Sequence, residues 1–129
     1  MQKEGFDVSC IKIDKILIGI EKLRKIMPQN AHIKKEQSFI MYIPHNEIID
    51  SKIEDEILIQ GVVDLMFVTD DEIILVDFKN TRIQNPNILR EKYVKQLELY
   101  SLAIKLNYEV HKVKAFIYSI QSTDLIMIN

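Results

Sequence analysis

The feature that most constrains the fold is the stretch "GVVDLMFVTDDEIILVDFKN" (residues 61–80), which predicts two apolar strands joined by an acidic turn. We place the centre of this turn between Asp70 and Asp71, so that the numbers of paired residues sum to a constant. In that register Asp64 of the first strand lies opposite Asp77 of the second. A slip of one residue would put the two carboxylates on opposite faces of the sheet.

The two faces of this hairpin differ in polarity. Asp64, Asp77 and Lys79 share one face, because side chains two residues apart on a strand point the same way. Met66 opposes Leu75 on that face. Directly opposed residues have Cβ atoms about 5 Å apart, so the two carboxylates repel each other unless one is protonated or a cation lies between them. The other face is expected to be an apolar layer for a helix, made of Val63, Leu65, Phe67, Ile74, Val76 and Phe78.

Two interpretations of this polar group remain open at this point. Hard oxygen ligands that converge on one point are typical of a Mg²⁺ site with coordination positions left for water and phosphate. Alternatively, Lys79 neutralises one aspartate in a structural ion pair, and Asp64 lies in water at a sheet edge. Two carboxylates beside one lysine leave an excess negative charge, which favours the metal site.

The remaining chain predicts an α/β or α+β sandwich with a mixed sheet. Apolar residues at helical spacing indicate a first helix over about residues 11–27, which Pro28 ends. The stretch "QSFIMYIP" alternates as a half-buried strand should, and the acidic segment after it, to residue 56, is expected to be an exposed loop. Pro86 suits the first turn of a second helix, which runs to about Leu106. Its apolar stripe comprises Tyr93, Leu97, Tyr100 and Ile104, and "KVKAFIYSI" and "DLIMIN" predict closing strands.

Composition excludes several classes of protein. The chain has 129 residues, enough for one domain, and no apolar run approaches the roughly 18 residues of a membrane span. A single cysteine, Cys10, excludes an internal disulfide framework and metal sites built from several cysteines. The start of the chain lacks an export signal, so the cytoplasm is the expected location. A net charge of −2 argues against a protein whose whole surface binds nucleic acid.

Four motifs in order resemble the PD-(D/E)xK nuclease superfamily and its RecB-like branch. The resemblance is closest to the nuclease domain at the C-terminus of the AddA subunit of bacterial AddAB helicase–nucleases. The motifs are "KEQSF" (residues 35–39), "IQGVVDL" (59–65), "ILVDFKN" (74–80) and "YVKQLELY" (93–100). The resemblance covers the chain from about Lys35 to its end, and implies a restriction-endonuclease-like core in which helices flank a mixed sheet.

The resemblance also implies an activity and a set of site residues. The activity is Mg²⁺-dependent hydrolysis of DNA, with Mn²⁺ as the alternative metal. Asp64 and Asp77 would hold the metal together with the backbone carbonyl of Phe78. Lys79 would orient or activate the attacking water and offset the charge that develops on the phosphate.

Other residues have a functional and a structural interpretation. Gln96 and Tyr100 would organise the site and contact nucleic acid, or else form a buried amide and a core aromatic. Glu36 matches the strand glutamate of the family and would contact the metal ligands without binding the metal itself. Gly61 indicates a bulge or a close backbone approach, here to the DNA strand. The basic residues expected to contact phosphates, or else to form a solvated face, are Arg82, Arg90, Lys92 and Lys95.

Two departures from the family pattern shape the functional expectation. The chain lacks the upstream "G-[ST]-x-x-H" helix whose histidine completes the metal site, and His32 is expected to be a surface residue. It also lacks a Walker A motif, so ATP would serve only helicase domains absent from this sequence. We therefore expect residues 1–129 to be a single nuclease domain, a C-terminal piece of a larger polypeptide. Its partners would be DNA, chiefly single strands, the helicase domains and an AddB-type subunit. The alternative is a catalytically incomplete domain that docks subunits or guides single-stranded DNA.

Overall fold

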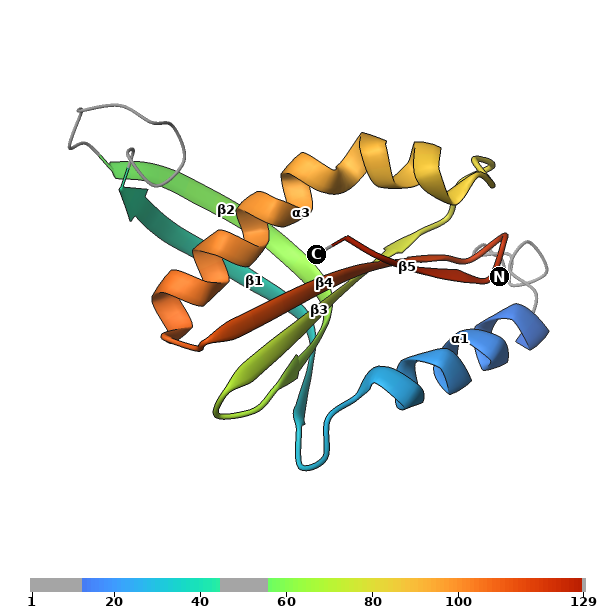
Figure 1. The fold of residues 1–129 in the computed structure, drawn as a ribbon, viewed down its shortest axis with the longest axis horizontal. Coiled ribbons are helices and arrows are strands. Elements are labelled where there is room, and N and C mark those ends of the chain that lie inside the picture. The colour runs from blue at the N-terminus through green and yellow to red at the C-terminus, as the bar shows by residue number, and fades with distance from the viewer. Residues whose placement is uncertain (1–12, 45–55, 129) are drawn as a thin grey trace, which may run out of the picture.

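The computed structural model describes residues 13–44 and 56–128, and Cys10 and most of the acidic segment lie outside these ranges. The described residues form one five-stranded sheet in the order β1-β2-β3-β4-β5, with two helices (Figure 1). The elements are α1 (Ile13–Ile26), β1 (His32–Pro44), β2 (Glu56–Val68), β3 (Glu72–Lys79), α3 (Pro86–Tyr108), β4 (Lys112–Ser119) and β5 (Asp124–Met127). Residues of α3 pack with a core cluster on one face of the sheet, and residues of α1 with a cluster on the other. The mixed sheet flanked by helices is confirmed.

The hairpin of β2 and β3 has the predicted register. Met66 pairs with Leu75, and the ladder runs on to Leu65 and Val76. The turn is tightened by Thr69, whose backbone N–H donates to the carbonyl of Glu72 at 2.9 Å, and whose hydroxyl accepts from the N–H of Glu72 at 3.0 Å. β3 then pairs in parallel with β4, and α3 makes the crossover between these two strands.

The alternation of side chains along β1 and β2 is interrupted part-way along the two strands. Their ladder pairs Lys35 with Leu65 and Gln37 with Val63, and skips the position between them, where Glu36 opposes Asp64. Glu36 has a φ of 47°, a left-handed conformation that residues other than glycine rarely adopt. Beyond this position, the side chains that faced one side of the sheet face the other side.

This change of faces corrects one expectation. Leu65 and Phe67 pack in the cluster beneath α1, as predicted. Val63, two residues earlier on the same strand, packs instead in the cluster beneath α3. Strict alternation would have placed all three together, and the break opposite Glu36 separates them.

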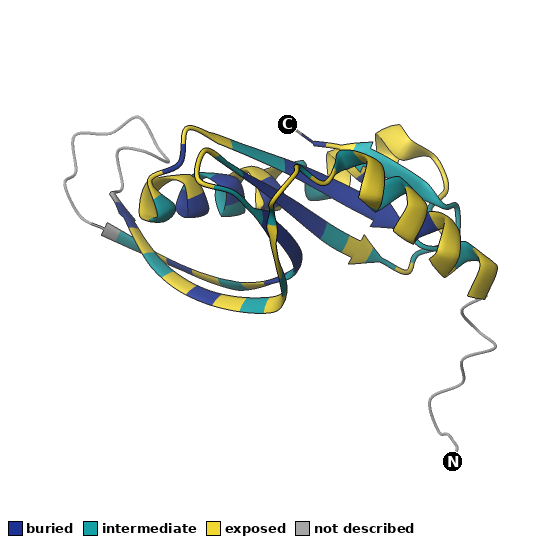
Figure 2. Ribbon diagram, turned by 90° about the horizontal axis from the view of Figure 1, so that it is seen from below, coloured by how far each residue is buried: buried dark blue, intermediate teal, exposed yellow. Residues whose placement is uncertain are grey.

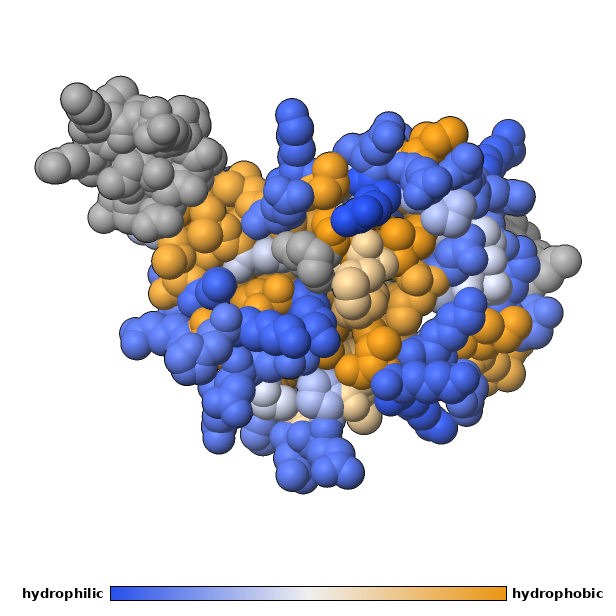
Figure 3. All heavy atoms as spheres, viewed as in Figure 1, coloured by the Kyte–Doolittle hydropathy of each residue, from blue (hydrophilic) through white to orange (hydrophobic). Residues whose placement is uncertain are grey.

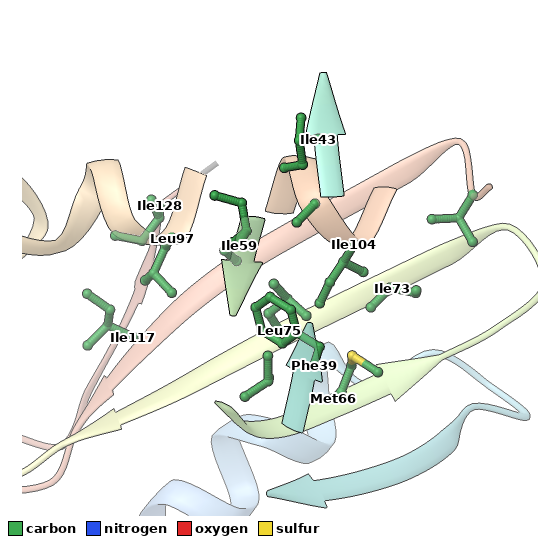
Figure 4. Packing of buried hydrophobic residues seen from close by; sticks show 14 of the residues in the cluster. Phe39, Ile43, Ile59, Met66, Ile73, Leu75, Leu97, Ile104, Ile117 and Ile128 are labelled. Atoms are coloured by element: carbon green, nitrogen blue, oxygen red, sulfur yellow. The ribbon is translucent and has the colours of Figure 1, made fainter. Parts of the chain in front are cut away.

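The main core lies between α3 and the sheet (Figure 4). Leu97 and Ile104 of α3 are almost completely buried there, which confirms the predicted stripe of this helix. The helix begins where expected: Pro86 occupies its first turn, and the Asn85 side chain accepts a hydrogen bond from the N–H of Asn87 at 2.9 Å. The sequence motif "YVKQLELY" therefore lies on a helix that is fixed over the sheet by its apolar side.

Helix α1 packs through its smallest residue and leaves apolar side chains exposed. Gly19 is buried against Tyr118, whose hydroxyl donates to the carbonyl of Lys15 at 2.8 Å. Figure 2 shows α1 as largely exposed. Figure 3 shows that hydrophobic patches lie among hydrophilic residues on the face seen in Figure 1. The exposed apolar residues of this helix are Ile13, Ile16, Leu17, Ile18 and Ile20. None of the described helices has the length and apolar character needed to cross a membrane.

Candidate functional site

The two predicted metal ligands come together where the β2–β3 ladder stops. Leu65 and Val76 are its last paired residues, and Asp64 and Asp77 are the next residues along the two strands. At this point the Asp64 side chain replaces a backbone acceptor, because its Oδ2 accepts a hydrogen bond from the N–H of Phe78 at 2.8 Å. This bond fixes the Asp64 carboxylate beside the strand that carries Asp77.

Asp77 and Lys79 form the charged centre of this site. Lys79 Nζ lies 2.9 Å from Asp77 Oδ2, and the two side chains are 23% and 20% exposed. Asp77 Oδ2 is itself buried, and no described donor makes an aligned hydrogen bond to it. The contact with Lys79 is therefore a charge–charge contact, and this carboxylate oxygen retains a lone pair for another ligand.

Electrostatics make the metal-free pair unfavourable when both acids are ionised. Burial raises the pKa of Asp77 above its ordinary value of 3.8. Lys79 opposes this shift through its contact and its positive charge, whereas the neighbouring Asp64 carboxylate raises the pKa of Asp77 further. A divalent cation held by Asp64 and Asp77 would offset the repulsion between them and stabilise the charged form of Asp77.

The donor set fits a hard divalent cation with an incomplete protein shell. The described residues contain no group of three or more His, Cys, Asp or Glu side chains that could hold a metal. Asp64 and Asp77 would supply two side-chain ligands, and the buried Oδ2 of Asp77 makes no aligned hydrogen bond with the described residues. Mg²⁺ is commonly held by one or two carboxylates and keeps several waters or phosphate oxygens, so two ligands suffice for it.

Gln96 and Tyr100 lie together on α3, above the sheet. Gln96 Nε2 donates to Tyr100 Oη at 3.4 Å, and Gln96 is exposed rather than a buried amide. The ring of Tyr100 packs edge-on against Phe39, with centroids 5.0 Å apart. Tyr100 thus combines a core contact through its ring with a polar contact through its hydroxyl.

Comparison with known proteins agrees with this geometry. Residues 14–126 match the family model of the PD-(D/E)XK nuclease superfamily. The chain belongs to this superfamily. The resemblance drawn from the four motifs is thereby confirmed, and the matched range includes Asp64, Asp77 and Lys79.

Curated relatives of this PD-(D/E)XK domain are named as the A-type subunit of an ATP-dependent helicase/nuclease. The protein from Ligilactobacillus salivarius is 31% identical over 100 residues, which are 75% of this chain and 8% of the relative. The protein from Listeria innocua is 25% identical over 133 residues, 95% of this chain and 11% of the relative. A Streptococcus pyogenes protein is 33% identical over 69 residues, 54% of this chain and 6% of the relative. The chain spans about a tenth of the length of the first two.

Of the two alternatives expected for Gly61, the structure shows a close approach to the backbone and not a bulge. The β1–β2 ladder pairs Gly61 with Phe39 without a bulge. A Cβ built on Gly61 would lie 2.4 Å from Oη and 2.6 Å from Cζ of Tyr100. The close approach is therefore made by the Tyr100 side chain, and it explains the glycine without a DNA strand.

Replacement of Gly61 by alanine is expected to displace Tyr100 and to lower the free energy of unfolding by about 1–3 kcal/mol. The ring cannot yield easily because Phe39 packs against it. Urea denaturation of Gly61→Ala, and of the same change in a Tyr100→Ala background, measures the effect. An equal cost in both backgrounds would show that the contact with Tyr100 is not the cause.

Two residues that sequence reasoning did not assign to the site adjoin Lys79. The Tyr93 ring centroid lies 4.1 Å from Lys79 Nζ, although the sequence pattern indicated Tyr93 only as part of an apolar stripe. Its position three residues before Gln96, one helical turn away, is the signal that could have found it. Ser119 pairs with Lys79 across the parallel ladder, and its fully buried hydroxyl has no described hydrogen-bond partner.

The remaining predicted residues are exposed on the surface. Glu36 is exposed and belongs to no metal-binding cluster of the described residues, although the ladder places it opposite Asp64. Arg90 has a structural partner, since its Nη2 donates to the carbonyl of Ile128 at 2.8 Å. His32 is exposed at the start of β1. The other basic residues expected to meet phosphates are exposed: Arg82, Lys92 and Lys95.

Proposed function

We propose that this chain is a Mg²⁺-dependent nuclease domain that hydrolyses phosphodiester bonds in DNA. One observation carries the proposal: Asp64 and Asp77 lie side by side at the end of the β2–β3 ladder, with Lys79 Nζ 2.9 Å from Asp77. Membership of a nuclease superfamily supports the reaction class. Two hard oxygen ligands support Mg²⁺, with Mn²⁺ as an alternative.

The proposed mechanism assigns a task to each residue of the site. Asp64 and Asp77 bind the cation through their carboxylates, and the Phe78 carbonyl is the third proposed ligand. When bound, the cation supplies a Lewis acid for a phosphoryl oxygen and lowers the pKa of a bound water. Lys79 Nζ donates a hydrogen bond to the attacking water and offsets the negative charge that grows on the phosphate.

The surroundings of the acid pair have a separate task in binding the substrate. Gln96 is exposed beside Tyr100, and we assign both to contacts with the nucleic-acid backbone. The exposed basic side chains of the nearby loop and of α3 extend this surface electrostatically. They are Arg82, Lys92 and Lys95.

The names of the relatives suggest the wider setting. We propose that the domain works within an ATP-dependent helicase–nuclease in double-strand-break repair, where it cuts strands that the helicase unwinds. ATP would act only on the helicase domains, and an AddB-type subunit would be the partner. The relatives' names and their much greater length support this setting.

A second candidate function is docking or guidance of single-stranded DNA without catalysis. The observation that favours it is the exposed apolar surface of α1, on which Ile13 and Leu17 are 64% and 58% exposed. Such a surface is typical of an interface. A docking role gains nothing from a partly buried acid pair, which is costly without a cation, so catalysis remains our first proposal.

The test of the proposal is cleavage of linear DNA by the purified chain. We expect single-stranded DNA to be hydrolysed with Mg²⁺ or Mn²⁺ and to remain intact with EDTA. Asp64→Ala removes one of the two proposed carboxylate ligands and should be inactive with either metal. Metal binding without cleavage by the wild-type chain would favour the docking function, and cleavage that survives in Asp64→Ala would overturn the assignment of the site.

Acidification is expected to weaken metal binding at a higher pH than for an ordinary carboxylate. The pKa of Asp77 is raised above 3.8, so Asp77 is still protonated in part where a free aspartate is ionised. The free energy of unfolding of the metal-free protein falls as pH rises from about 3.8 through the raised pKa, because the folded state holds this proton more tightly. Metal affinity rises over the same window. Mn²⁺ titrations and thermal unfolding across pH check both trends, and Asp77→Asn should flatten them.

A further inference from the structure

Lys79 is held between two groups, and only one of them belongs to the acid pair. Its Nζ lies 2.9 Å from Asp77 Oδ2 and 4.1 Å from the centroid of the Tyr93 ring. Tyr93 is half-buried in the first half of α3 and packs against the main core cluster. The ammonium is thus in contact with the sheet on one side and with the helix on the other.

An ion pair alone does not fix a lysine. Its flexible four-carbon stem lets the ammonium swing around a carboxylate, and the contact with Asp77 is not an aligned hydrogen bond. The face of an aromatic ring attracts a cation through its quadrupole, most strongly where water is partly excluded. The Lys79 side chain is only 23% exposed, so the ring of Tyr93 restricts where Nζ can lie. Lys92 also approaches this ring, but its Nζ is 5.4 Å from the centroid and the residue is exposed.

We propose that Tyr93 is a positioning residue that holds the ammonium of Lys79 at the acid pair. This inference rests on the proposed nuclease function and adds a residue to it. Tyr93 acts through Lys79 and not on the substrate. The ring face carries the effect, because the contact is made with the ring and not with the hydroxyl.

The chain contains a matched control for this contact. Tyr108, at the other end of α3, also carries a lysine over its ring: Lys34 Nζ lies 5.8 Å from that centroid. Tyr108 packs against the same core cluster as Tyr93, at the end of the helix away from the acid pair. Tyr93→Leu and Tyr108→Leu therefore remove the same side chain from the same helix, and only the first removes a ring from Lys79.

The first part of the test is spectroscopic and needs no activity. In metal-free protein with labelled lysines, the ε-methylene resonances of Lys79, assigned by their loss in Lys79→Met, should show an upfield ring-current shift. This shift should vanish in Tyr93→Leu and persist in Tyr93→Phe and Tyr108→Leu. A Lys79 resonance that does not move in Tyr93→Leu overturns the proposal.

The second part is kinetic. Tyr93→Leu should lower kcat for DNA cleavage about tenfold with KM within twofold, whereas Tyr93→Phe and Tyr108→Leu should stay near the wild-type kcat. A wild-type kcat in folded Tyr93→Leu, or a Tyr93→Phe kcat as low as that of Tyr93→Leu, overturns the proposal. The two failures are distinguishable: absence of cleavage by the wild-type chain overturns the proposed function, and absence of the ring-current shift overturns the role of Tyr93.

Discussion

Replacement of Asp77 by asparagine is expected to lower the rate of metal-dependent DNA cleavage by about 10³-fold or more. Asparagine keeps the shape of the side chain but removes the negative charge, so the pair would lose one of its two carboxylate ligands. The same change should raise the thermal stability of the metal-free protein, because the raised pKa of Asp77 shows that its charged form is disfavoured there. Single-turnover cleavage and thermal unfolding with and without Mg²⁺ measure both effects.

Asp71→Asn is the matched control for this change. Asp71 is exposed in the β2–β3 turn, at the opposite end of the same hairpin, so the variant carries the same change of charge away from the acid pair. It should retain the wild-type cleavage rate and the stabilisation by Mg²⁺. An Asp77→Asn protein that cleaves within tenfold of the wild-type rate would contradict the role given to Asp77.

Lys79→Met is expected to lower the cleavage rate by about 10²–10³-fold while metal binding persists. Methionine preserves much of the apolar stem, and it removes the ammonium that lies 2.9 Å from Asp77. Loss of this positive charge should leave the affinity for Mg²⁺ unchanged or higher, because the acid pair becomes more negative. Calorimetry and single-turnover kinetics separate the two effects.

The control for Lys79→Met is Lys112→Met, which removes an exposed charge at the start of β4. It should leave both metal affinity and the cleavage rate near wild type. A Lys79→Met protein that no longer binds metal would show that the lysine organises the pair itself, and its assignment to the attacking water would be wrong.

The sequence predicted the acid pair because the relevant information is local. Side chains alternate along a strand, and the turn near Asp70 and Asp71 sets which residues oppose each other, so the pairing of Met66 with Leu75 followed directly. The stripe of α3 followed equally from helical spacing, and Leu97 is buried as expected. Short-range periodicity and turn position determine these features.

The missed features depend on how distant elements meet. The left-handed backbone of Glu36 and the skipped position opposite it reverse the faces of the ribbon, which a strict alternation rule cannot predict. The contact of Tyr100 with Gly61, like that of Tyr93 with Lys79, depends on the rotation of α3 over the sheet. Helical spacing predicted α1 correctly, but spacing alone does not show what covers its apolar side chains.

The most direct measurement is a calorimetric titration of the wild-type chain and of Asp64→Ala with Mg²⁺ and Mn²⁺. Asp64 is replaced and not Asp77, because Asp77 is in an ion pair with Lys79 and its loss would also release the lysine. The Asp64 carboxylate instead accepts a hydrogen bond from the Phe78 N–H. We predict saturable binding of metal by the wild-type chain and loss of that binding in the variant. Identical titrations of the two proteins, with no binding in either, would contradict the proposed metal site and leave Asp64, Asp77 and Lys79 as a structural cluster of charges.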